Sequence, residues 1–275
     1  MSETITPPLA LHGWYMLTQF ADLTLSSGED QAEERGRRLD ALGAVLAGWE
    51  DLGDNGWSGL YRLVGGGSDY MLLHLRPSLD LLGEAERAMR LHPSSQDLAI
   101  MNDYVSVVEL GLYGHTLGLA RRAERDGIEI GSDEWAVLVE EFLTEQLETA
   151  YTQRRLYPRQ PDGMSYVCFY PMNKRRNVEQ NWYTQTLAER ARLMQEHGHT
   201  GRGYAGKVSQ IITGSIGLDD WEWAVTLFAP DPIEFKNLVT EMRYDEVTSV
   251  YGEFGSFWVG HRIFGEAIAG ELKGE

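Results

Sequence analysis

The sequence predicts an α+β fold in which two ferredoxin-like halves form a barrel-like pair. Two observations support this: the order β-α-β-β-α-β occurs twice, and a mostly helical stretch separates the two units. The 275-residue chain is 43% apolar and 24% charged, an ordinary composition for a globular protein with a sizeable core. Each antiparallel sheet has helices on one face only, so the two open faces are expected to pack against each other.

The first ferredoxin-like half is expected over residues 13–115, after a short disordered lead-in at 1–12. A strand rich in aromatic residues begins it, and Ser26 with Glu29 forms a capping-box pattern for the helix that follows. Leucines at helical spacing continue that helix to about residue 50. Two strands around a glycine-rich turn, a helix and a last strand complete the half, at 59–67, 69–77, 81–92 and 103–114.

A helical connection is expected over 116–153, and the second half over 154–275. This half begins with the apolar strand "SYVCFYPM" and the helix "TQTLAERARLMQEHG". Two strands follow, joined by a turn around Asp219–Asp220. Asp231 and Pro232 then provide an N-cap and a first-turn proline for a helix, and "GEFGSFWVGHRI" is the last strand.

Charge and composition exclude several classes of function. The formal net charge of −18 repels nucleic acid and anionic membranes at long range. No apolar run is long enough to span a bilayer, and the start lacks the features of a signal peptide, so a cytoplasmic protein is expected. The single cysteine, Cys168, excludes an internal disulfide framework and is expected to be a small buried hydrophobe.

Common nucleotide-binding, metalloprotease and serine-hydrolase motifs are absent. The glycines at 65–67 lie between two strands, which favours a hairpin turn over a phosphate-binding loop.

The stretch "FYPMNKRRN" places Tyr170, Lys174 and two arginines at the end of a predicted strand, in a chain with only four lysines. These cations could bind carboxylates, and Tyr170 could relay a proton or an electron. The alternative is a solvated basic turn.

His197 and His199 flank Gly198 at the expected end of a helix, where a histidine interacts well with the helix dipole whether or not it binds a ligand. No Cys, His, Asp or Glu at matching spacing completes a zinc site. A haem needs only one axial histidine, because the porphyrin supplies the other four donors.

Gln210 is expected to share a strand face with Val208 and Ile212. A buried amide among apolar residues needs a hydrogen-bond partner. The pattern leaves open whether Gln210 is a satisfied core residue or a polar group beside a cofactor.

Taken together, these stretches resemble the chlorite dismutase superfamily, and within it the coproheme decarboxylases of the Gram-positive type. The resemblance is dense from "RLYP" at Arg155 to "VG" at Gly260, and includes "YVCFYPMNKRR", "NWY", "EHG", "YAGKV", "QIITGS" and "DEV". It thins toward the start to "GWY" and "YVSVVEL".

The resemblance implies paired ferredoxin-like halves in a pentameric ring. It implies that His197 is the axial iron ligand, that His199 plays no part, and that Tyr170 forms a radical with Lys174 beside it. It also implies further porphyrin-binding residues: Arg155, Pro171, Met172, Asn173, Gln210 and Thr248, where Thr248 replaces the usual serine.

The activity that the resemblance implies is oxidative decarboxylation of two propionates of Fe-coproporphyrin III to vinyls, which gives haem b with hydrogen peroxide as oxidant. The porphyrin is then both substrate and cofactor, and transient contact with a ferrochelatase is expected. The alternatives are a chlorite dismutase-like or peroxidase-like haem enzyme and a non-catalytic haem-binding chaperone. Chlorite dismutation uses a distal arginine, where this chain has Gln210.

Overall fold

A computed structural model describes residues 7–24 and 32–274, and its elements follow the expected order. The first half contains β1 (Ala10–Leu23), α1 (Ala32–Gly48), β2 (Trp57–Leu63), β3 (Tyr70–Arg76), α2 (Leu79–Leu91) and β4 (Leu98–Gly111). The connection contains α3 (Tyr113–Asp126), α4 (Asp133–Leu147) and α5 (Ala150–Leu156). The second half contains β5 (Tyr166–Lys174), α6 (Leu187–Arg202), β6 (Ser209–Gly214), β7 (Trp223–Ala229), α7 (Ile233–Met242), α8 (Glu246–Tyr251), β8 (Gly252–Phe254), β9 (Trp258–Ile263) and α9 (Ala267–Lys273).

The beginning of the first half differs from the expectation. Residues 10–12, assigned above to a disordered lead-in, belong to β1, because they pair with residues 109–111 of β4. The capping-box residues Ser26 and Glu29 lie outside the described residues. The glycines at 65–67 all have positive φ and connect β2 to β3, so the expected hairpin turn is confirmed.

The expected last strand is divided into β8 and β9 at Gly255. A Cβ at Gly255 would lie 2.8 Å from Pro171 Cγ and 2.9 Å from the Trp221 ring, so the chain bends where β5 and Trp221 press against it. The residue before α7 is Pro232, not Asp231 as expected, because the helix begins at Ile233. Asp231, one residue earlier, still accepts a hydrogen bond of 2.9 Å through its Oδ1 from the Ile233 N–H.

The strands close into a barrel. Eight of them pair in the order β7-β6-β4-β1-β3-β2-β9-β5, β5 pairs again with β7, and β8 is added to β5. Within each half the pairing is antiparallel and ferredoxin-like. The halves are joined at two seams, β4 with β6 and β2 with β9. The expected barrel-like pair is therefore confirmed.

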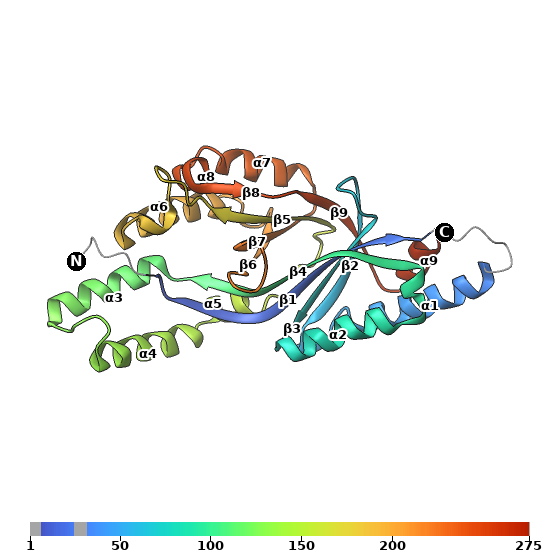
Figure 1. Cartoon of the computed structure of the whole chain (residues 1–275), viewed down its shortest axis with the longest axis horizontal. Coiled ribbons are helices and arrows are strands. Elements are labelled where there is room, and N and C mark those ends of the chain that lie inside the picture. The colour runs from blue at the N-terminus through green and yellow to red at the C-terminus, as the bar shows by residue number, and fades with distance from the viewer. Residues whose placement is uncertain (1–6, 25–31, 275) are drawn as a thin grey trace.

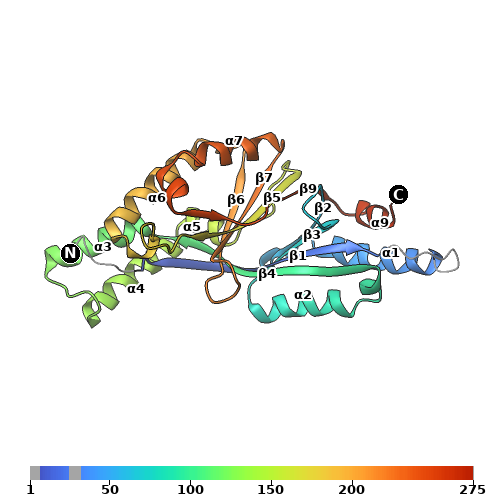
Figure 2. The same cartoon turned by 45° about the horizontal axis from the view of Figure 1, so that its top comes forward.

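The helices cover the outside of this barrel. Figures 1 and 2 show α1 and α2 along the first half, α6, α7 and α8 over the strands of the second half, and α3 and α4 projecting at one end. The outer faces form separate apolar clusters under these helices. No helix of the described residues is long and apolar enough to cross a membrane.

The barrel interior contains the largest apolar cluster, to which both halves contribute. Phe169 of β5 is 1% exposed and lies at the centre of this cluster. Its ring lies 5.8 Å from Phe20 and 5.7 Å from Tyr104 of the first half, and 5.8 Å from Trp258 of the second. Phe169 therefore holds the two halves together by ring packing.

Replacing Phe169 by alanine should lower the free energy of unfolding by about 3–5 kcal/mol, because it leaves a cavity between the halves. Val178→Ala is a suitable control, since Val178 is fully exposed. Urea unfolding measures both variants, and a Phe169→Ala midpoint equal to that of the control would contradict this packing role.

Candidate active site

The outer face of β5 carries Tyr170, Met172 and Lys174. These residues alternate with Val167 and Phe169, which point into the barrel, because successive side chains of a strand face opposite sides. Pro171 and Asn173 face the other way: Pro171 lies against Gly255, and Asn173 Oδ1 accepts a 2.8 Å hydrogen bond from the Glu222 N–H. The structure therefore groups the side chains of Tyr170, Met172 and Lys174 but not those of Pro171 and Asn173.

Tyr170 is held by aromatic packing. Its ring stacks on Phe257 at 4.5 Å and 25°, with Phe254 at 5.8 Å. Burial raises the pKa of Tyr170, with a smaller contribution from Cys168 and an opposing one from the Arg243 guanidinium. Its hydroxyl therefore stays protonated at neutral pH and is available as a hydrogen-atom donor. Cys168 is buried in the same apolar cluster, as expected, and burial raises its pKa to about 12.

Lys174 ends β5 and is only 8% exposed. Its Nζ lies 5.0 Å from the centre of the Trp182 ring. Burial lowers the pKa of Lys174 to about 8, against the opposing effects of Asp245 and Glu222. Its amine can therefore gain and lose a proton close to neutral pH.

His197 does not end its helix, contrary to the expectation from Gly198. The helix α6 runs on to Arg202, and Gly203 is its C-cap residue. Gly198 is absent from the glycines with positive φ, so it does not adopt the left-handed conformation that ends many helices. His197 is therefore an interior helical residue, partly buried, whereas His199 is exposed.

Asp245 fixes the orientation of the His197 ring. Its Oδ2 lies 2.8 Å from His197 Nδ1, and its Oδ1 accepts a 2.7 Å hydrogen bond from the Thr248 N–H at the start of α8. Burial raises the pKa of Asp245, but its hydrogen bonds with His197 and Thr248 outweigh burial and lower it. An ionised Asp245 accepts the Nδ1 proton of a neutral imidazole, which leaves the Nε2 lone pair for a metal.

Gln210 lies half-buried on β6, on the opposite face from Ile211, as expected. A Cβ at Gly201 of α6 would lie 3.9 Å from Gln210 Nε2 and 3.4 Å from Met242 Cε. The Gln210 amide and Met242 therefore lie beside Gly201 of the helix that carries His197.

The segment from Met242 to Thr248 connects these groups. Met242 and Gln210 both lie beside Gly201. The Arg243 guanidinium lowers the pKa of Tyr170 against the effect of burial. Asp245 contacts His197 and raises the pKa of Lys174 against the effect of burial. Thr248 is 6% exposed and one turn from Asp245.

The side chains of Arg175 and Arg176 interact with other residues of the chain. Arg175 Nη1 donates to Gln180 Oε1 and to the Val250 carbonyl, and Arg176 pairs with Glu222 at 3.6 Å. Arg155 lies on α5, which packs against β1 and β4. Within residues 7–24 and 32–274, no hydrogen bond or ion pair joins Arg155 to Tyr170, Lys174 or His197.

Three polar groups at this site have no partner for their side-chain atoms. The Tyr170 hydroxyl, the Lys174 ammonium and the Gln210 amide make no hydrogen bond or ion pair to any other residue that the structure describes. None of these polar atoms is fully closed off from solvent, so each can bind water or a polar ligand. A porphyrin with carboxylate substituents fits: His197 Nε2 can bind its iron, and the hydroxyl and ammonium can bind its carboxylates.

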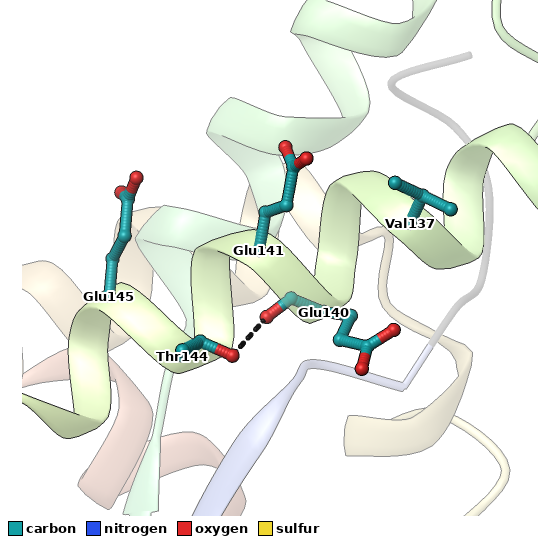
Figure 3. A pocket seen from close by; sticks show the side chains of 5 residues that line it. All are labelled: Val137, Glu140, Glu141, Thr144 and Glu145. Atoms are coloured by element: carbon teal, nitrogen blue, oxygen red, sulfur yellow. Dashed lines mark hydrogen bonds between the residues drawn. The ribbon is translucent and has the colours of Figure 1, made fainter.

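A shallow hollow on α4 is a poor alternative site. Figure 3 shows that its lining comes from one helix, with the side chains of Glu140, Glu141 and Glu145 along it beside Val137 and Thr144. An anionic porphyrin would be repelled by the three carboxylates.

The sequence interpretation did not identify Asp245, Glu222, Arg243 or Trp182 as parts of this site. Asp245 could have been found from its position three residues before Thr248, which is typical of an N-cap. Glu222 and Trp182 reach the site through long-range packing and have no local signal.

A family model described as chlorite dismutase matches residues 35–263. Proteins named coproheme decarboxylase from Thermus thermophilus and Staphylococcus carnosus are each 40% identical to the chain, over 95% and 94% of it and 95% of each relative. A solved heme-binding protein from Thermus thermophilus superposes with a TM-score of 0.76 at 39% identity, covering 97% of both chains. This chain therefore belongs to the chlorite dismutase family.

Proposed function

We propose that the protein is a coproheme decarboxylase, which converts Fe-coproporphyrin III to haem b through a three-propionate intermediate. In each of two steps one propionate becomes a vinyl group, CO₂ leaves, and hydrogen peroxide accepts the hydride equivalent. The unpartnered Tyr170, Lys174 and Gln210 around His197 are the observation that supports this most, because an anionic iron porphyrin satisfies all of them. The relatives named above carry the same activity in their names.

The residues have separate tasks in this proposal. His197 binds the iron through Nε2 while Asp245 holds Nδ1. Lys174 and the Thr248 hydroxyl bind propionates, Gln210 occupies the distal side, and Arg155 together with the backbone of Pro171–Asn173 binds the rim. Arg155 lies on α5 in the connection between the halves and makes no hydrogen bond or ion pair to the other site residues that the structure describes.

Tyr170 and Lys174 carry out the chemistry on the protein side. When bound, the iron porphyrin supplies the oxidising equivalents that peroxide delivers. Tyr170 would lose its phenolic hydrogen as an electron to the bound oxidant and a proton to Lys174, whose pKa is about 8. The tyrosyl radical would then take a hydrogen atom from the propionate carbon beside the ring, which restores the phenol. The second oxidising equivalent would remove the remaining electron as CO₂ leaves and the vinyl group forms, and Lys174 would pass its proton on toward the water that peroxide becomes. The aromatic stack with Phe257 keeps the Tyr170 ring in one orientation and excludes water.

Gln210 disfavours chlorite dismutation, because an uncharged amide is poorly suited to hold an oxyanion at the iron. The Tyr170–Lys174 arrangement disfavours a non-catalytic haem-binding protein, which needs neither group. We further propose, from the resemblance, a cytoplasmic homopentamer that receives its substrate by transient contact with a ferrochelatase.

Replacing His197 by alanine should weaken binding of Fe-coproporphyrin III by more than about tenfold and change the iron's absorption spectrum, because the axial ligand is lost. His199→Ala is the matched control, since His199 is exposed on the same helix. Titration followed by absorption measures both. If His199→Ala alters the spectrum and His197→Ala does not, the ligand assignment is wrong.

Replacing Tyr170 by phenylalanine should slow decarboxylation by on the order of 10² or more, because direct participants in a transfer step contribute that much. Binding should persist, since the ring still stacks on Phe257. Mass spectrometry of the porphyrin after peroxide addition follows the loss of CO₂. A Tyr170→Phe variant that turns over at the wild-type rate would refute the radical role, and a wild-type protein that leaves the porphyrin unchanged would refute the proposed function.

Affinity for Fe-coproporphyrin III should fall as pH rises above about 8, where the free Lys174 ammonium loses its proton. A bound carboxylate favours the protonated form, so affinity can fall by up to about tenfold per pH unit, the limit for one linked proton. Lys174→Met should remove this decline, whereas Lys236→Met, at an exposed lysine, should retain it. Equal pH dependence in both variants would show that Lys174 does not bind the substrate.

A further inference from the structure

Glu222 is a buried carboxylate to which the proposed mechanism assigns no role. It lies just before β7, only 7% exposed. Its Oε2 accepts a 2.8 Å hydrogen bond from the backbone N–H of Lys174. Its own N–H donates to Asn173 Oδ1 at 2.8 Å, and its carbonyl accepts from the Ser215 N–H at 2.9 Å. Glu222 and the end of β5 thus bind each other in both directions.

The hydrogen bonds between Glu222 and the end of β5 replace strand pairing where β5 extends beyond β7. The register of β5 with β7 ends at Met172 opposite Trp223, so the backbone of Asn173 and Lys174 has no partner in β7. On the other side, Lys174 pairs with Gly252 of β8. The Glu222 side chain therefore completes the hydrogen bonding of β5 on the β7 side and fixes where the Lys174 side chain leaves the strand.

We propose that Glu222 is a positioning residue for Lys174: its carboxylate anchors the end of β5 and holds the Lys174 ammonium beside Trp182, facing the substrate site. The inference rests on the proposed function for the meaning of Lys174, but the contacts of Glu222 stand independently of it.

Two carboxylates and one aromatic ring surround Lys174. Asp245 faces it from the start of α8, Glu222 from the start of β7, and the Trp182 ring covers its Nζ. Both carboxylates raise the pKa of Lys174 against the larger effect of burial, which lowers it to about 8. Glu222 in turn pairs with Arg176, and the buried Tyr183 hydroxyl has its pKa raised by burial and by Glu222.

Asp245 and Glu222 differ in what they can do for Lys174. Asp245 is already engaged by His197 and the α8 N-terminus. Glu222 contacts the Lys174 backbone directly, and its partner Arg176 is exposed and 3.6 Å away. Glu222 is therefore the residue whose charge and length can be changed without disturbing the iron ligand.

Competitive labelling with acetic anhydride tests this on the ligand-free protein. The chain has only four lysines, so peptide mass spectrometry can follow Lys174 separately, with exposed Lys236 as an internal reference. In Glu222→Gln the amide oxygen can still accept the Lys174 N–H, but the charge is gone. The pH midpoint of Lys174 labelling should fall by on the order of one unit. Glu253→Gln removes an equivalent charge at an exposed residue of neighbouring β8 and should leave the midpoint unchanged.

Glu222→Asp provides a second variant that keeps the charge but draws it back by one methylene, and it should give an intermediate shift. A Lys174 midpoint in Glu222→Gln equal to that in Glu253→Gln overturns the proposal; if Glu222→Gln does not fold, an unshifted Glu222→Asp overturns it. This readout contains no porphyrin. Failure of the wild-type protein to decarboxylate Fe-coproporphyrin III would therefore refute the proposed function and leave the result for Glu222 intact.

Discussion

The hydrogen bond between Asp245 and His197 is the interaction on which the candidate site depends. Asp245 is the N-cap residue of α8, and its carboxylate accepts a hydrogen bond from the Thr248 N–H. The backbone of α8 therefore fixes the carboxylate that contacts the imidazole. With Nδ1 engaged at 2.8 Å, only Nε2 remains as a metal donor. The same carboxylate opposes the effect of burial on Lys174. One helix cap therefore sets the orientation of His197, the proposed metal ligand, and part of the charge around Lys174.

A second constraint is how an acidic protein binds an anionic ligand. Arg175 and Arg176 are neutralised or occupied by the protein, and Lys174 is the buried cation of this stretch that makes no ion pair within the described residues. With a pKa of about 8, Lys174 is mostly protonated at neutral pH, and a carboxylate bound beside it would favour the protonated form further. The overall charge of −18 repels anions at long range, so an anionic ligand depends on local cations such as Lys174.

The sequence predicts the framework well because strands and helices leave local periodic signals. The double β-α-β-β-α-β order, the Gly65–Gly67 turn and the outward face of Gln210 all follow from alternation or turn chemistry. The helix end expected at Gly198 was wrong, because glycine ends many helices but Gly198 lies inside α6. Glu222 could not be predicted, since it contacts Lys174 across 48 residues, where β7 begins beside the end of β5. The distinction between His197 and His199 came from the resemblance, and exposure along α6 agrees with it.

The two halves share a topology, but the polar side chains on their outer faces differ in burial. In the first half His74 is also a histidine with one ring nitrogen engaged, since its Nδ1 lies 2.8 Å from Ser58 Oγ. It is completely buried, however, and burial lowers its pKa to about 3. The Trp49 ring lies 6.0 Å from the His74 ring, and leucines of α1 belong to the apolar cluster of this outer face. In the second half His197 keeps 28% of its side chain exposed. The candidate site therefore lies in the second half, where the side-chain polar atoms of Tyr170, Lys174 and Gln210 have no partner among the described residues.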